Sequence, residues 1–254
     1  MRFGLIMLIL LCLTLSATPQ ERRVGGTFIG AIVAADGIVV GSDSRSTFIE
    51  ADGRPVGYID GTQKIFAGSG TAVAVSGLTS VDGEMFGSFV DRNSFLLDRP
   101  ADEILFGFAV WLPFKNSTGV MLLSAGFREG RPLICGRTVS QPQACQDTGL
   151  ITNKRSPSLE AWINAQKVAP KAAAAAAALK QAIQESAAKD ATVGGGISLA
   201  QLRPGAPMIW LENSFSGNWK TTCELVRDYR NGRARIVPTT SHQDLTRYLN
   251  AACR

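Results

Sequence analysis

The chain has 254 residues, of which 45% are hydrophobic and 19% are charged, and its formal net charge is +5. This composition is typical of a folded globular protein and excludes a disordered chain. The charge is spread along the sequence, and no basic block with interleaved aromatic residues indicates nucleic-acid binding.

The first 17 residues have the pattern of a secretory signal peptide. Arg2 precedes an apolar run from Leu5 to Leu15, and the small residues Ser16 and Ala17 follow. The run is shorter than the roughly 20 residues of a membrane-spanning helix, so removal of residues 1–17 is favoured over an uncleaved anchor. We therefore expect a periplasmic or extracellular protein with no stable membrane insertion after cleavage.

Strand and helix signals alternate in groups along the rest of the chain. Strands before helices, joined by short hairpin turns, predict an α+β fold of antiparallel sheets covered by helices. No interdomain linker is visible, and residues from about 217 onward form a C-terminal extension with one helical stretch at its end. The predicted strands are 31–35, 38–40, 63–68, 71–77, 119–127, 131–139, 197–202 and 207–212, and the predicted helical segments are 79–92, 99–112 and 157–189 with a break at Pro170.

Cysteine and histidine usage limits the chemistry. Four cysteines remain after loss of the signal peptide, and their positions favour the pairs Cys135–Cys145 and Cys223–Cys253, although other connectivities stay open. No CxxC spacing indicates a metal or redox site, and we expect no cofactor and no metal. The single histidine, His242, lies in the first turn of a predicted helix, so a hydrolase here must find its base elsewhere.

The first two hairpins carry polar residues at their open ends. A turn at Asp36-Gly37 predicts pairs whose numbers sum to 73, which places Asp43 opposite Gly30. In the second hairpin the predicted pairing places Lys64 opposite Ala74, with Gly77 just beyond the open end. If the two hairpins are aligned neighbours, these residues converge on Thr27.

Such a cluster can activate a threonine without histidine. If the bond after Gly26 is cut, Thr27 gains an α-amine whose pKa of about 7.7–8.0 suits a general base. Lys64 would lower the pKa of the hydroxyl, Asp43 would keep Lys64 charged and oriented, and the N–H of Gly77 could bind an oxyanion. Taken singly, each residue also fits an ordinary turn, strand or surface pair.

The residues resemble the β subunits of proteasomes and their bacterial relatives, which are threonine-type N-terminal nucleophile (Ntn) hydrolases. The resemblance lies in Gly26-Thr27, in Asp43-Ser44-Arg45 sixteen to eighteen residues later, and in Lys64 of "QKIF". It continues with Ser76-Gly77 before a helix and with Asp190 in "KDATVGGGISLAQL". The order of elements matches over residues 26–213.

The resemblance implies a four-layer αββα Ntn-hydrolase sandwich for residues 27–216, a propeptide of residues 18–26 and an extension of residues 217–254. It implies a peptide or amide substrate, a peptidase that matures by cleavage after Gly26, and possible assembly into a homo-oligomeric ring. Thr27 is the implied nucleophile, supported by Lys64, Asp43, Gly77, Arg45 and Asp190. The implied pocket residues are Ser46, Thr62, Val75 and Thr79.

The sequence departs from the family pattern at three points. The interval from Asp43 to Lys64 is about five residues longer, which predicts a loop insertion in "FIEADGRPVGYIDG". Val193 stands where the family has a supporting serine, and a second serine, expected around 148–158, has no clear counterpart. An Ntn acylase acting on a small amide and a catalytically silent subunit therefore remain alternatives. A rival start at Thr62 lacks a following Asp-Ser-Arg and ranks below Thr27.

Overall fold

The computed structural model describes residues 24–50, 52–77, 80–81, 84–111, 120–215 and 220–252. The predicted signal peptide, residues 18–23 of the predicted propeptide, and Thr79 lie outside the described residues.

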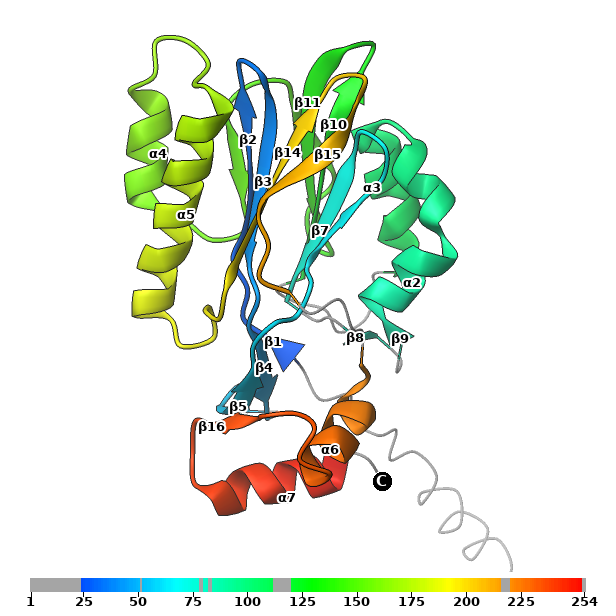
Figure 1. Cartoon of the computed structure of the whole chain (residues 1–254), viewed down its shortest axis with the longest axis vertical. Coiled ribbons are helices and arrows are strands. Elements are labelled where there is room, and N and C mark those ends of the chain that lie inside the picture. The colour runs from blue at the N-terminus through cyan, green and yellow to red at the C-terminus, as the bar shows by residue number, and fades with distance from the viewer. Residues whose placement is uncertain are drawn as a thin grey trace, which may run out of the picture.

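Two five-stranded antiparallel sheets form the centre of the protein (Figure 1). The first has the strand order β13-β2-β3-β14-β15, and the second has the order β12-β11-β10-β7-β6. The strands of the first sheet are β2 (Ile29–Ala34), β3 (Gly37–Asp43), β13 (Leu150–Thr152), β14 (Ile197–Arg203) and β15 (Ala206–Glu212). Those of the second are β6 (Ile65–Ala67), β7 (Ala72–Ser76), β10 (Met121–Arg128), β11 (Arg131–Thr138) and β12 (Ala144–Gln146).

The two sheets share a core because alternate residues of each strand point to opposite faces. In β2, Ile29 and Ala31 belong to the cluster that also contains Ala74 and Leu123 of the second sheet. The neighbouring Ile32 belongs instead to a cluster with residues of helix α5. Both faces of these strands are buried, which explains their nearly continuous apolar sequences.

Helices pack on the remaining face of each sheet. Helices α4 (Pro157–Asn164) and α5 (Ala172–Lys189) lie against the first sheet, and the chain breaks between them at Pro170 as predicted. Helices α2 (Phe86–Arg92) and α3 (Ala101–Phe108) lie against the second, with 3₁₀ turns η1 (Ser94–Asp98) and η2 (Ala109–Trp111). The fold is therefore α+β with antiparallel sheets, as expected.

The predicted helix at 79–92 begins later than its apolar spacing indicated. Short strands β8 (Ser80–Val81) and β9 (Glu84–Met85) pair with each other before α2. Met85 has extended backbone (φ −75°, ψ 141°), so the helix starts only at Phe86.

The turn of the first hairpin is Ala35-Asp36 and not the predicted Asp36-Gly37. Gly37 pairs with Ala34, and its φ of 141° together with the 2.1 Å that would separate a Cβ from Leu202 O requires glycine at this position. The Asp36 carboxylate meanwhile accepts a hydrogen bond from Ala172 N at the start of α5. The paired numbers consequently sum to 71, and the predicted pairing of Asp43 with Gly30 is wrong.

The second hairpin is shifted by one residue from the prediction. Ile65 pairs with Ala74 across a four-residue loop that Gly68 N closes by donating to Thr71 O at 3.0 Å. Lys64 therefore lies opposite Val75, whose N–H donates to Lys64 O at 3.1 Å. A register shift of one residue moves every side chain of a strand to the opposite face of the sheet. The observed register of β6 and β7 therefore sets the direction of the side chains near Lys64.

A third sheet lies below the two large ones in Figure 1. Its order is β1 (Val24–Gly25), β4 (Ser46–Ile49), β5 (Pro55–Ile59) and β16 (Val237–Pro238). The predicted loop insertion is thus a β-hairpin, β4–β5. The C-terminal extension has two helices, α6 (Thr222–Arg230) and α7 (His242–Ala252), where the sequence predicted one.

The extension and the inserted hairpin share one hydrophobic core. Phe48 and Val56 of the hairpin pack with Val226, Leu245 and Leu249 of the extension, all less than 3% exposed. We call β1, β4, β5, β16, α6 and α7 the small-sheet unit. Its core holds the inserted hairpin in place, although the two segments are far apart in sequence.

The disulfide Cys135–Cys145 is confirmed and joins β11 to β12. Cys223 is also disulfide-bonded, while its predicted partner Cys253 lies outside the described residues. His242 lies in the first turn of α7, as predicted, and is exposed; Asp244 N donates to Ser241 Oγ at the start of this helix. Across the described part of the chain, no helix is both long and apolar enough to span a membrane.

Candidate active site

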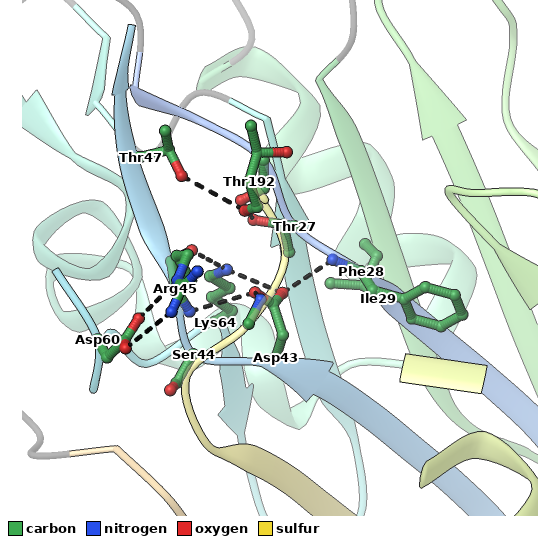
Figure 2. Close-up of polar contacts among 12 residues, drawn as sticks. Thr27, Phe28, Ile29, Asp43, Ser44, Arg45, Thr47, Asp60, Lys64 and Thr192 are labelled. Carbon is green, nitrogen blue, oxygen red and sulfur yellow. Dashed lines mark hydrogen bonds and ion pairs between the residues drawn. The ribbon is translucent and has the colours of Figure 1, made fainter. Parts of the chain in front are cut away.

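The carboxylate of Asp43, at the end of β3, is buried and accepts four hydrogen bonds (Figure 2). Its Oδ1 accepts from Phe28 N at 2.8 Å and from Lys64 Nζ at 3.0 Å. Its Oδ2 accepts from Gly194 N at 2.9 Å and Arg45 N at 3.2 Å. One ammonium and three backbone N–H groups thus compensate a charge that would be costly to bury alone.

Lys64 is the cation of this pair, and its side chain is completely buried. Besides Asp43, its ammonium donates to Arg45 O at 2.5 Å. Burial lowers the pKa of Lys64 below its ordinary value, and the neighbouring Asp43 and Asp60 only partly oppose this effect. A buried lysine with a lowered pKa can release and accept a proton more readily near neutral pH than a surface lysine.

Thr27 lies directly before the residue whose N–H binds Asp43, and it is 2% exposed. Its Oγ1 lies 2.5 Å from the carbonyl oxygen of Gly26 and donates to it. The hydroxyl is therefore next to the carbonyl group of the peptide bond that joins Gly26 to Thr27. Asp43 and Lys64 lie within the same polar cluster, linked to this bond through Phe28 N (Figure 2).

Gly26 occupies a position that only glycine fits. Its φ is 85°, and a Cβ there would lie 2.2 Å from Thr192 Cβ and 2.3 Å from Thr192 O. Of the two glycines before Thr27, the second is thus required both by its backbone conformation and by its contact with Thr192.

Asp190 follows helix α5 and orients Thr192 by hydrogen bonds. Its Oδ1 accepts from Thr192 N at 2.9 Å and from Thr192 Oγ1 at 2.5 Å, and its Oδ2 pairs with Lys154. Burial raises the pKa of Asp190, but the hydrogen bonds from Lys154 and Thr192 outweigh it and lower the pKa below its ordinary value. Asp190 is therefore ionised at neutral pH and contacts Gly26 only through Thr192.

Arg45 links the inserted hairpin to the loop after α5. Its guanidinium forms two hydrogen bonds to Asp60, at 2.9 and 3.1 Å, and lies 3.5 Å from the centre of the Tyr58 ring. The bond to Asp60 raises the pKa of Arg45 despite partial burial. Arg45 also donates to Ala191 O at 3.2 Å, so its side chain supports the cluster while its backbone binds Lys64 and Asp43.

Ser44, the middle residue of Asp-Ser-Arg, binds the glycine run. Its Oγ accepts from Gly196 N at 2.8 Å and from Gly61 N at 3.3 Å. A Cβ on Gly194 would lie 2.9 Å from the Arg45 guanidinium carbon, at a φ of 153°. The glycines allow the loop to approach both residues closely.

Three polar residues of the cluster escaped the sequence interpretation. Asn153 donates to Thr27 O at 2.8 Å and accepts from Ile29 N at 2.8 Å, so its amide spans Phe28. Lys154 and Thr192 are the partners of Asp190 described above. Asn153 and Lys154 lie in the region 148–158, where the family resemblance leads one to expect a serine. This expected interval was the only feature of the sequence that pointed to the two residues.

The other predicted residues make no described polar contact to Thr27. Gly77 follows β7 with a φ of 85°. Ser46 is 5% exposed, and its Oγ has no hydrogen-bond partner within the described residues. Thr62 N donates to Ser44 O at 2.9 Å, and Val75 is 1% exposed in the core beneath α2 and α3. Val193, in place of the family's serine, is fully buried against α5.

Comparison with known proteins adds no family to this description. A scan of the sequence against protein-family models gives no match, and a search of curated proteins gives no similar sequence. The chemistry of the cluster therefore has to be inferred from its own geometry.

Replacing Lys64 by methionine should destabilise the protein strongly. The Asp43 carboxylate would stay buried without its cation, which costs about 3–5 kcal/mol. Lys180→Met is a matched control, because Lys180 pairs with Glu212 at a site where the two side chains are 41% and 33% exposed, and it should cost less than about 1 kcal/mol. Urea denaturation measures both, and equal losses would contradict the burial argument.

Proposed function

We propose that the chain is a threonine-type Ntn hydrolase, a peptidase or amidase that matures by cutting its own Gly26–Thr27 bond. The observation that carries the proposal is the 2.5 Å approach of Thr27 Oγ1 to the carbonyl oxygen of Gly26, beside a fully buried lysine-carboxylate pair. The two central sheets with helices on their outer faces support the αββα sandwich that the family resemblance implies.

The bond to be cut is held on both sides. Before it, Val24 pairs with Phe48 and Gly25 with Thr47 in the ladder of β1 and β4. After it, Asn153 binds Thr27 O, and Asp43 binds Phe28 N. Holding a nucleophile and a carbonyl in one orientation removes much of the entropic cost of the reaction.

The proposed maturation is an acyl shift followed by hydrolysis. Thr27 Oγ1 attacks the carbonyl carbon of Gly26, and the hydroxyl proton passes to Lys64 in its neutral form, since the α-amine is still part of the peptide bond. The C–N bond breaks, the proton returns to the Thr27 nitrogen, and an ester joins Gly26 to Oγ1. Water then hydrolyses the ester, which releases the Gly26 carboxylate and frees the Thr27 amine and hydroxyl.

The mature enzyme would repeat this chemistry on other chains. The free α-amine of Thr27 takes the hydroxyl proton, and the acyl group of the substrate is transferred to Oγ1 and then to water. Two partners of the Lys64 ammonium, Asp43 and Arg45 O, are fixed by the fold, which leaves the third N–H bond of its protonated form for another acceptor. That bond can stabilise the ionising hydroxyl.

The N-terminus of the purified protein tests the proposal. We expect it to begin at Thr27, and we expect Thr27→Ala to retain residues 24–26, because the nucleophile is missing. Thr246→Ala, which changes an exposed threonine on α7, should mature like the parent chain. Mass spectrometry and N-terminal sequencing give the answer, and a Thr27→Ala protein that still begins at residue 27 would show that another protease makes the cut.

The rate of maturation should rise with pH. Because burial lowers the pKa of Lys64, the neutral fraction of Lys64 increases as pH rises through this lowered value, and the rate should then level off. Purified precursor, transferred to buffers of increasing pH, reports the rate by the loss of intact chain. A rate that falls with pH would contradict the role of neutral Lys64 as the base.

The substrate preference separates a peptidase from an acylase. The segment before the cut lies extended along β4, so we expect the mature protein to hydrolyse fluorogenic peptides faster than simple N-acyl amides. Thr27→Ala serves as the inactive control for both assays. Faster release of the N-acyl group would favour the acylase alternative, and no turnover by a chain that begins upstream of Thr27 would favour the silent subunit.

A further inference from the structure

Lys154 lies in a segment that the polar cluster fixes tightly. The preceding residue, Asn153, binds Thr27 O and Ile29 N through its side chain, and its own N–H donates to Ile29 O at 3.2 Å. Lys154 O accepts from Thr152 Oγ1 at 2.9 Å. The backbone that carries Lys154 is thereby fastened to the strand that begins just after the bond to be cut.

The Lys154 ammonium pairs with Asp190, and the contact continues to Gly26. Asp190 orients Thr192 through both its N–H and its hydroxyl. Thr192 in turn fills the space that a side chain at Gly26 would need, and its carbonyl oxygen accepts from Thr47 Oγ1 at 3.4 Å. Since Thr47 pairs with Gly25, the loop and β4 together enclose the segment before the cut.

This ion pair contributes little to global stability. The side chains of Lys154 and Asp190 are 28% and 37% exposed, and pairs open to solvent are worth about 0–1 kcal/mol. A stabilising role alone does not explain why Asp190 of this pair also binds Thr192, the residue packed against Gly26.

We propose that Lys154 is a positioning residue for the self-cleavage, fixing the Gly26 carbonyl through Asp190 and Thr192. The inference rests on the proposed function, because it concerns the same bond. Lys154 does not touch the reacting atoms, and it acts only through the residues between.

The charge of Lys154 has a second consequence for the base. Among the charged groups that act on Lys64, Asp43 and Asp60 raise its pKa, and Lys154, whose effect is smaller, lowers it. Removal of the Lys154 charge should therefore raise the pKa of Lys64, so that a higher pH is needed to reach the same neutral fraction. A residue with a purely structural role would not move the pH profile in this way.

The test compares the maturation of purified precursors over a range of pH. Lys154→Met should cut after Gly26 roughly tenfold more slowly, with the midpoint of the pH profile displaced upward. Lys154→Arg, which keeps the charge, should restore the midpoint. Lys180→Met is the matched control, because Lys180 forms a similarly exposed ion pair with Glu212 away from the cluster, and it should match the parent chain.

A second variant separates the contact from the charge. Thr192→Val keeps the shape of the side chain but loses the hydroxyl bond to Asp190, so it should slow maturation without moving the midpoint. Thr192→Val also tests the inference if Lys154→Met does not fold. A parental rate and midpoint in Lys154→Met, or a parental rate in Thr192→Val, would overturn the inference while leaving the proposed function intact. A parent chain that never cuts after Gly26 would overturn both.

Discussion

The buried ion pair between Lys64 and Asp43 constrains the whole centre of this protein. Lys64 directly precedes β6 of the second sheet and Asp43 ends β3 of the first, so the pair joins the two sheets at the ends of these strands. Buried charged groups need hydrogen bonds in place of solvent. Besides Lys64, the Asp43 carboxylate accepts hydrogen bonds from three backbone N–H groups. Each donor fixes a different segment: the residue after Thr27, the turn of Asp-Ser-Arg, and the glycine loop.

The glycine loop satisfies this constraint because its residues lack side chains. Gly194 and Gly195 approach Arg45, Ser44 and Asp60 so closely that a Cβ on either would collide. The same loop carries Asp190 and Thr192, and Asp190 binds Thr192, which contacts Gly26. One loop therefore both donates a hydrogen bond to the buried Asp43 carboxylate and packs against Gly26. It links the buried ion pair to the position of the bond before Thr27.

The small-sheet unit supports the cluster from the other side. Tyr58 and Asp60 of the inserted segment hold the Arg45 side chain, and the C-terminal helices cover the hairpin with a core of their own. Residues 24–25 form the edge strand of that sheet. The extension at the end of the chain thus stabilises the hairpin against which the segment before Thr27 is paired.

The sequence by itself determined the α+β class and most strands and helices, and it favoured the Cys135–Cys145 bridge and the partnership of Asp43 with Lys64. These follow from apolar periodicity and from residue types, which local sequence expresses directly. Hairpin register did not follow, since Gly37 lies in β3 beside the distant strand β14, where an added Cβ would collide with Leu202 O, and the local Asp-Gly pattern does not record that neighbour. The inserted hairpin, α6, Asn153, Lys154 and Thr192 were found only in the tertiary structure. The contacts of Asn153 and Lys154, and those between the hairpin and the extension, join segments 36 to more than 100 residues apart, which no local pattern records.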